Sequence, residues 1–149
     1  MDFQASFSPE EWRTLQFAFL WVFHAVSGAD GRVDPKEIDT ICREIDRASA
    51  PEAPLAHEVL QTMERDFVRL YIQYRHDPRH PLKGLEGVAD LLDRKTPADL
   101  AAGFKAALVR MGRGVAASSV CHESSPRGGA SREENRAVAR VREALRAEG

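Results

Sequence analysis

The stretch AVSGADGRVDPKEIDTI, residues 25–41, carries carboxylates at the spacing of the second half of an EF-hand loop. Such a loop supplies calcium ligands from positions 1, 3, 5, 7, 9 and 12 and has glycine at position 6. With Gly31 at position 6, Asp30 falls at position 5, Asp34 at position 9 and Glu37 at position 12. Carboxylate oxygens suit a hard divalent cation, so Asp30, Asp34 and Glu37 are the candidate metal ligands of this chain.

The first half of that loop lacks ligands. The same register places Val26 at position 1 and Gly28 at position 3, and neither side chain has an oxygen. A structural role explains the same carboxylates, because Asp34 can cap the next helix and Glu37 can complete a capping box three residues later. The sequence therefore favours a helix corner, with a weak site for calcium or another divalent cation as the alternative.

The apolar helix before this loop and the segment ADGRVDPKEI, within residues 19–45, resemble the signature of the tellurite-resistance protein B (TerB-like) family of helical domains. The resemblance implies a compact all-α bundle with metal contact at the acidic turn residues Asp30, Asp34 and Glu37. It also implies a part in stress response, or in assemblies at the inner membrane face, rather than catalysis. The second half departs from the pattern, since PRGGASREE carries no aspartate-glycine pair.

Histidine and cysteine offer two further chemistries. His76 and His80 are four residues apart, but Pro78 between them should break the helix that would place both on one zinc ion. Cys121 and His122 adjoin a glutamate and supply the residue types of a nucleophilic hydrolase. They fall in a segment rich in glycine and serine, so a hydrolase ranks a distant third. His24, on an apolar helix, is expected to be a core histidine bonded to a backbone carbonyl.

An arginine stripe marks the last helix, where Arg132, Arg136 and Arg140 recur every four residues. Glutamates share that helix, and the formal net charge of the chain is only -2, so nucleic-acid binding is not favoured. A helix with both signs of charge suits a solvated face or contact with an acidic partner. We expect a protein partner to contact either this stripe or the acidic side of the second helix, which carries Asp39, Glu44 and Asp46.

Elements that could position these residues begin at four capping boxes, which start at Ser8, Asp34, Thr96 and Ser131. In the first three, proline follows at the first helical position, where its missing N–H costs nothing. The first helix is apolar nearly all round and should be central. A long third helix is expected over Leu55–Tyr74, and residues 118–130 should form a flexible loop.

Apolar spacing downstream of each start is helical, and no segment alternates as a half-buried strand would. We therefore predict an all-α, single-domain bundle of about six helices over residues 1–149. Two repeated helix pairs are an alternative description, in which Asp34 corresponds to Ser131 and Ile41 to Val138. Charged residues make up 30% of the chain, a globular balance that excludes wholesale disorder.

Localisation is expected to be cytoplasmic. The N-terminus has no secretory pattern, and the apolar run at residues 15–26 is shorter than the roughly 20 residues that cross a bilayer. In that compartment Cys42 and Cys121 should both be reduced thiols. Together these features predict a non-enzymatic helical interaction module with no cofactor, a weak cation sensor being the alternative. Peripheral membrane association is compatible with both.

Overall fold

A computed structural model describes residues 3–27, 35–49, 52–122 and 132–147, and within these ranges the chain is all-α, as predicted. A 3-10 turn at Gln4–Ser6 precedes the first helix. The helices are α1 (Pro9–Ser27), α2 (Pro35–Ser49), α3 (Pro54–Arg65), α4 (Phe67–Arg75), α5 (Pro81–Lys95), α6 (Ala98–His122) and α7 (Arg132–Leu145). No strand occurs in the described ranges.

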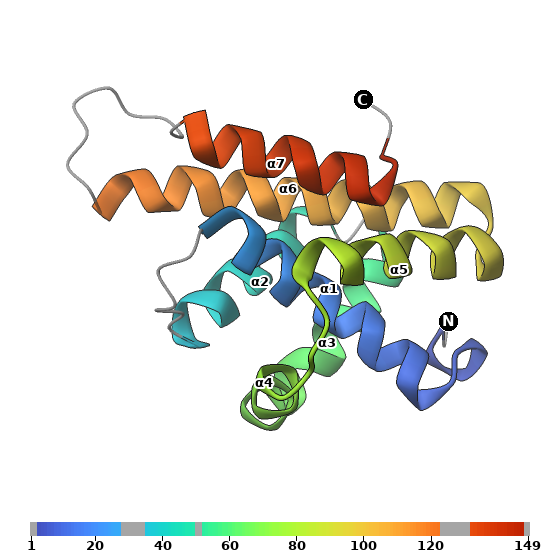
Figure 1. Cartoon of the computed structure of the whole chain (residues 1–149). Helices are drawn as coiled ribbons and strands as arrows, with labels where there is room; N and C mark the ends of the chain where they lie inside the picture. Colours follow the sequence, from blue (N-terminus) through green and yellow to red (C-terminus); the bar gives the residue numbers. More distant parts are fainter. Residues whose placement is uncertain (1–2, 28–34, 50–51, 123–131, 148–149) are drawn as a thin grey trace.

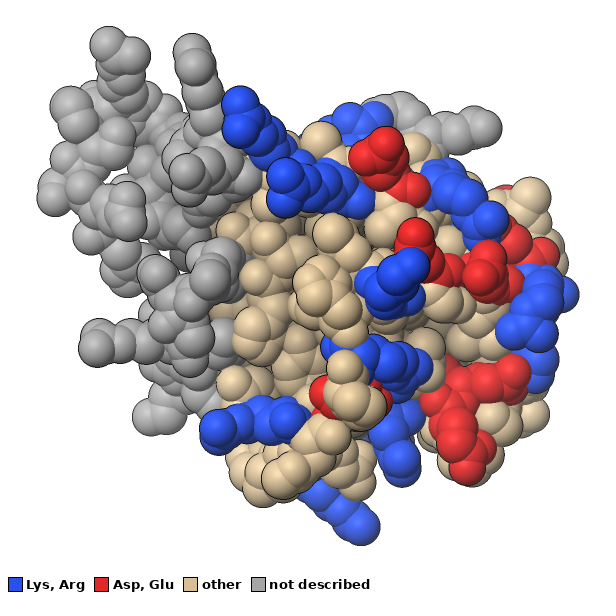
Figure 2. Space-filling view, in the orientation of Figure 1, with Lys and Arg blue, Asp and Glu red and all other residues tan. Residues whose placement is uncertain are grey.

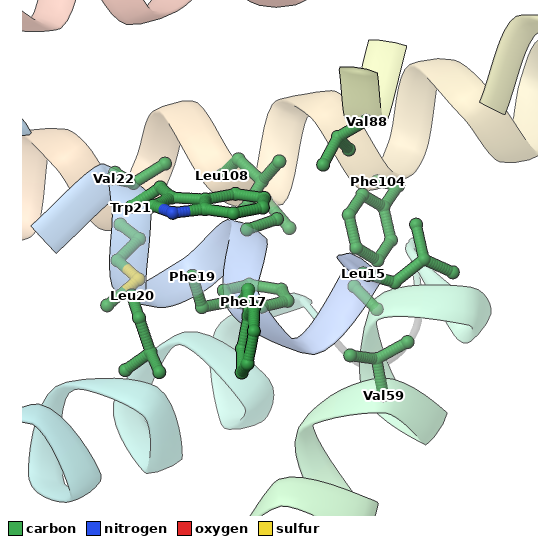
Figure 3. Close-up of a cluster of buried hydrophobic side chains, with 14 of the residues drawn as sticks. Leu15, Phe17, Phe19, Leu20, Trp21, Val22, Val59, Val88, Phe104 and Leu108 are labelled. Atoms are coloured by element: carbon green, nitrogen blue, oxygen red, sulfur yellow. The ribbon is translucent and has the colours of Figure 1, made fainter. Parts of the chain in front are cut away.

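The first helix is central, as its sequence predicts. Every side chain from Phe17 to Phe23 on α1 is at most 5% exposed, and the other helices surround it (Figure 1). Aromatic rings of α1 meet the neighbouring helices edge to face. The ring centroids of Phe19 and Phe104 of α6 are 5.5 Å apart, and those of Phe17 and Tyr74 of α4 are 5.4 Å apart. Figure 3 shows Phe17, Phe19 and Phe104 in one cluster with Val59 of α3 and Leu108 of α6. Such pairs are worth about 0.5 to 1.5 kcal/mol beyond their burial.

A glycine brings α5 unusually close to α1. A Cβ built on Gly84 would lie 2.6 Å from the indole ring of Trp21, which is 1% exposed. Real side chains do not tolerate that distance, so only glycine allows this approach. The residues between α4 and α5 contact the same indole, because the Arg79 guanidinium lies 4.7 Å from its ring centroid and Asp77 accepts a 2.8 Å hydrogen bond from Arg79.

Of the four predicted capping boxes, the structure describes those at the starts of α1 and α6. At α1 the box forms as expected: Glu11 N–H donates to Ser8 Oγ at 3.1 Å, and Ser8 N–H donates to Glu11 Oε1 at 2.8 Å. At α6 the predicted box is wrong, since the helix begins at Ala98 and Thr96 donates its hydroxyl to the Leu92 carbonyl at the end of α5. The starts of α2 and α7 follow Asp34 and Ser131, which lie outside the described residues.

Two predicted boundaries are corrected by the structure. The long helix expected over Leu55–Tyr74 is two helices, because Asp66 leaves the helical conformation with φ −147° and ψ 50°. Aspartate has low helix propensity, and Asp66 precedes α4 without a side-chain capping hydrogen bond. The loop expected over residues 118–130 begins later, since α6 continues to His122. The remainder of that loop lies outside the described part of the chain.

The two ends of the bundle differ. Helices α6 and α7 run side by side, with α5 packed against α7, whereas α4 lies at the opposite side of the molecule (Figure 1). Helix α4 packs on α2 and α3 and reaches α1 through Tyr74. No helix in the described ranges is long and apolar enough to cross a bilayer.

Candidate functional site

The predicted cation ligands cannot be assembled from the structure. Asp30 and Asp34 lie outside the described residues, and Glu37 lies in the first turn of α2 with its side chain outside the described part. The cation site at this loop therefore stays a prediction. Elsewhere in the described ranges, histidine, cysteine, aspartate and glutamate side chains form no group of three or more that could hold a metal ion.

The histidine pair lies at two helix ends, as the proline between them predicts. His76 is the C-cap of α4, and His80 is the N-cap of α5, where its Nδ1 accepts a 3.3 Å hydrogen bond from Leu82 N–H. Cys121 and His122 fall in the last turn of α6, and their side chains are outside the described part of the chain. The hydrolase hypothesis is therefore not tested.

Cys42 is a buried thiol on α2. Its environment raises its pKa well above the usual range, first through burial and then through the carboxylates of Asp39 and Asp46. A thiol held protonated in this way is a poor nucleophile. Cys42 therefore serves the core rather than chemistry.

His24 joins α1 to α4. Its Nδ1 lies 2.7 Å from the Tyr74 hydroxyl, and the two rings stack with centroids 5.3 Å apart. Burial lowers the pKa of His24, and a hydrogen bond with the Leu20 carbonyl opposes that shift in part. The Leu20 carbonyl, a backbone group of the kind expected, thus acts on His24, and the Tyr74 hydroxyl is its side-chain partner. Burial also raises the pKa of Tyr74 above its usual range, with smaller contributions from Tyr71 and Asp77.

The acidic side of α2 is partly engaged within the fold. Arg43 bridges Asp39 at 3.0 Å and Glu64 of α3 at 3.1 Å, while Asp46 contacts His57 Nδ1 at 2.5 Å. These pairs tie α2 to α3. Two of the three carboxylates expected to meet a partner are therefore already paired, which weakens the case for an external contact at this face.

The feature that sequence reasoning missed is the outer side of α4. Val68 is 70% exposed and Ile72 is 54% exposed, and they are the large hydrophobic side chains that the described residues leave exposed. At about 100° per residue, Val68, Arg69, Ile72 and Arg75 share one side of the helix. We call these four residues the α4 face. Figure 2 shows uncharged surface with neighbouring basic side chains at the lower edge of the molecule, where Figure 1 places α4.

The charges of the α4 face are available for a partner. Arg69 and Arg75 are exposed, and the contact of Arg69 with Asp66 is long, at 3.9 Å between two solvated side chains. An exposed pair of this kind is worth about 0 to 1 kcal/mol. Each guanidinium can therefore exchange its present surroundings for a partner carboxylate at little cost. A sequence signal existed, because Val68 and Ile72 are apolar and lie off the Phe67, Leu70 and Tyr74 stripe.

Comparison with known proteins places the chain in a family without assigning it a function. No family model matches the sequence, and no solved structure matches it. "Uncharacterized protein ORF11'" of Methanothermobacter thermautotrophicus is 34% identical over 119 residues, which cover 74% of this chain and 76% of that protein. Identity of this extent along most of both sequences indicates common descent and a shared fold. The chain belongs to the same protein family as this archaeal ORF11' protein.

Proposed function

We propose that the chain is a non-enzymatic, TerB-like helical interaction module whose α4 face docks an acidic amphipathic segment of a partner protein. The observation that carries the proposal is the exposure of Val68 and Ile72 between two arginines. Burying an aliphatic side chain of this size contributes about 1.5 to 3 kcal/mol. The pair can therefore anchor an interface, and their spacing of four residues matches a helical partner.

Arginine defines the chemistry of that partner. Arg69 and Arg75 flank the aliphatic pair, and α4 contains no lysine. The planar guanidinium binds a carboxylate through two parallel hydrogen bonds, which the lysine ammonium cannot do. A partner segment with two apolar residues one helical turn apart and carboxylates on either side would satisfy both parts of the α4 face.

A protein partner fits α4 better than a lipid surface does. Helices that lie on membranes expose large apolar residues such as tryptophan, phenylalanine and leucine. Helix α4 directs Phe67, Leu70 and Tyr74 into the core and exposes two β-branched side chains. Its apolar contribution to a bilayer would be small, so we propose a protein partner rather than a lipid surface for this face.

The cellular setting is proposed from the resemblance at residues 19–45. It points to a stress response of the tellurite type, and the N-terminal sequence adds a cytoplasmic location to the proposal. The proposed role involves neither catalysis nor a cofactor. The cation-sensor alternative depends on Asp30 and Asp34, and its test is described in the Discussion.

Capture from the native host with four forms of the protein tests the proposal. They are the wild type, Val68→Ser with Ile72→Ser, Arg69→Glu with Arg75→Glu, and a control with Arg13→Glu and Arg47→Glu on other exposed surfaces. A partner of the α4 face should be captured by the wild type and the control, and should be lost with both α4 variants. Binding of the purified partner should weaken at least about tenfold, which corresponds to about 1.4 kcal/mol.

Two results would contradict this function. One is a captured partner that binds all four forms equally, with no change in its salt dependence. The other is binding of the wild type to phosphatidylserine vesicles that depends on Val68 and Ile72, which would assign the face to lipid. Circular dichroism melts of each variant keep loss of binding distinct from loss of the fold.

A further inference from the structure

A second feature lies at the other side of the bundle, in a groove between α6 and α7 near the end of α5. The groove has a volume of about 470 Å³, within the range of about 300 to 1,000 Å³ typical of small-molecule sites. Alanines of α6, among them Ala102 and Ala106, line it and leave room above the helix backbone. We call this the basic groove for its cationic lining residues, which are Lys105, Arg110, Arg113, Arg142 and Arg146.

Positive charge in the basic groove exceeds negative charge. Asp93 is the lining carboxylate, and it is shared between two cations: Lys105 Nζ lies 3.0 Å from one of its oxygens and Arg146 Nη2 lies 3.0 Å from the other. Lys105 is 8% exposed, and it is the buried charged residue of the described chain. A buried cation requires compensation, and half of one carboxylate supplies it incompletely.

Two arginines of the groove have no carboxylate within ion-pair distance among the described residues. They are Arg113, which is exposed, and Arg142, which is half-buried between α6 and α7. Partial burial removes part of the Arg142 side chain from water, and no carboxylate of the described residues provides a counter-charge. An anion in the groove would therefore gain more binding free energy from Arg142 than from an exposed arginine such as Arg13, and Arg113 adds a second guanidinium.

We infer that the basic groove binds a small phosphate-bearing ligand, with the phosphate at Arg113 and Arg142 and a compact uncharged part on the alanines of α6. A phosphate group carries about two negative charges at neutral pH and presents three acceptor oxygens. Two guanidinium groups match that charge and donate in the paired geometry that phosphate accepts. The site is independent of the α4 face, on which the proposed function rests.

Arginines on α7 also suggest a nucleic-acid backbone, but the surroundings favour a single phosphate group. Arg146 is held by Asp90 at 2.7 Å as well as by Asp93, so acidic side chains border one end of the groove. A continuous phosphate backbone would pass these carboxylates and be repelled. A ligand that fits inside the groove avoids them.

Calorimetric titration at constant ionic strength tests the inference with pyrophosphate, ADP and adenosine as probes. We expect the wild type to bind pyrophosphate and ADP and not adenosine. Arg113→Gln, which changes an exposed side chain, should weaken ADP binding at least about tenfold, and Arg113→Gln with Arg142→Gln should abolish it. The matched control, Arg13→Gln with Arg47→Gln, should bind ADP as the wild type does.

Three outcomes overturn the inference. The first is that neither pyrophosphate nor ADP binds the wild type more tightly than chloride at the same ionic strength. The second is that the control loses as much affinity as the groove variants. The third is that citrate or a single-stranded oligonucleotide binds more tightly than ADP through the same two arginines, which would replace the ligand class.

Discussion

On α4 the arginines flank two exposed aliphatic side chains, whereas between α6 and α7 they surround a hollow lined by alanines. Arg69 and Arg75 stand in solvent on a convex helix. Arg142 is half-buried, and its neighbour Lys105 is almost fully buried against Asp93. The same residue type thus occurs in two surroundings on opposite sides of one bundle (Figure 1).

The two regions differ in which interaction offsets the entropy lost when a ligand binds. A convex face gives a small molecule few contacts, so only a partner that covers Val68 and Ile72 together gains enough from burial. A concave site surrounds a small ligand and lowers the local dielectric, which strengthens each charge contact. The shape of the surface, more than its charge, therefore determines which class of ligand each region binds.

The largest expected effect tests whether the two sides of α4 are as different as they look. Leu70 is 6% exposed, so Leu70→Ala should lower the free energy of unfolding by about 2 to 5 kcal/mol. Ile72→Ala, two residues away and exposed, should change it by less than about 0.5 kcal/mol. Urea unfolding of both variants measures this. Equal losses would mean that Ile72 belongs to the core and that the α4 face does not exist.

A second prediction asks whether both regions depend on one core. Gly84→Ala places a Cβ against the Trp21 ring and should cost about 1 to 3 kcal/mol of stability. Gly87→Ala on the same helix meets nothing within 4 Å and should stabilise by about 0.5 to 1 kcal/mol, since alanine is the better helix former. If thermal melts gave the two variants the same sign, the close approach of α5 to α1 would be wrong.

Sequence patterns predicted the core of this fold better than its surfaces. The apolar circumference of α1 indicates a central helix without knowledge of its neighbours. The break at Asp66 escaped detection because Met63, Phe67, Leu70 and Tyr74 keep helical spacing across it, so periodicity is unchanged by the interruption. The separate helix is visible only in the backbone dihedral angles of Asp66.

Neither binding region follows from local pattern alone. Val68 and Ile72 are visibly apolar, but a sequence cannot say whether another element covers them. The arginines of α7 are also visible, yet the groove needs Lys105 and Arg113 from α6, which are distant in sequence from Arg142 and Arg146. These side chains come together only because α6 packs against α7, and a tertiary contact of this kind is not visible in the local sequence.

A third prediction asks whether the acidic loop adds a cation site to these two regions. If Asp34 is chiefly an N-cap, Asp34→Ala should cost about 0.5 to 2 kcal/mol in chelator, and Asp34→Asn should keep most of the stability. Calcium should then leave the melting midpoint unchanged. A calcium-dependent rise in the wild type that disappears in both variants would make Asp30, Asp34 and Glu37 a binding site.

The smallest expected effect uses pH to test how α4 is attached to α1. Burial lowers the pKa of His24 below its ordinary value of 6.5, so the unfolded chain binds a proton more readily than the folded one. The contribution of His24 is therefore complete above that value and is lost as pH falls through the lowered pKa. Because His24 contacts Tyr74, acid should weaken the attachment of α4 to α1.

His24→Phe preserves a ring for stacking on Tyr74 and removes the titration. Between about pH 7.5 and 5.5, urea unfolding of the wild type should lose more stability than that of His24→Phe, because the ordinary pKa of 6.5 lies inside this interval. Glu11 and Asp77 also have lowered pKa values, but their contributions are lost only in stronger acid. A wild type that loses no more stability than the variant would show that protonating His24 costs the fold nothing, and that the His24–Tyr74 contact does not hold α4 in place.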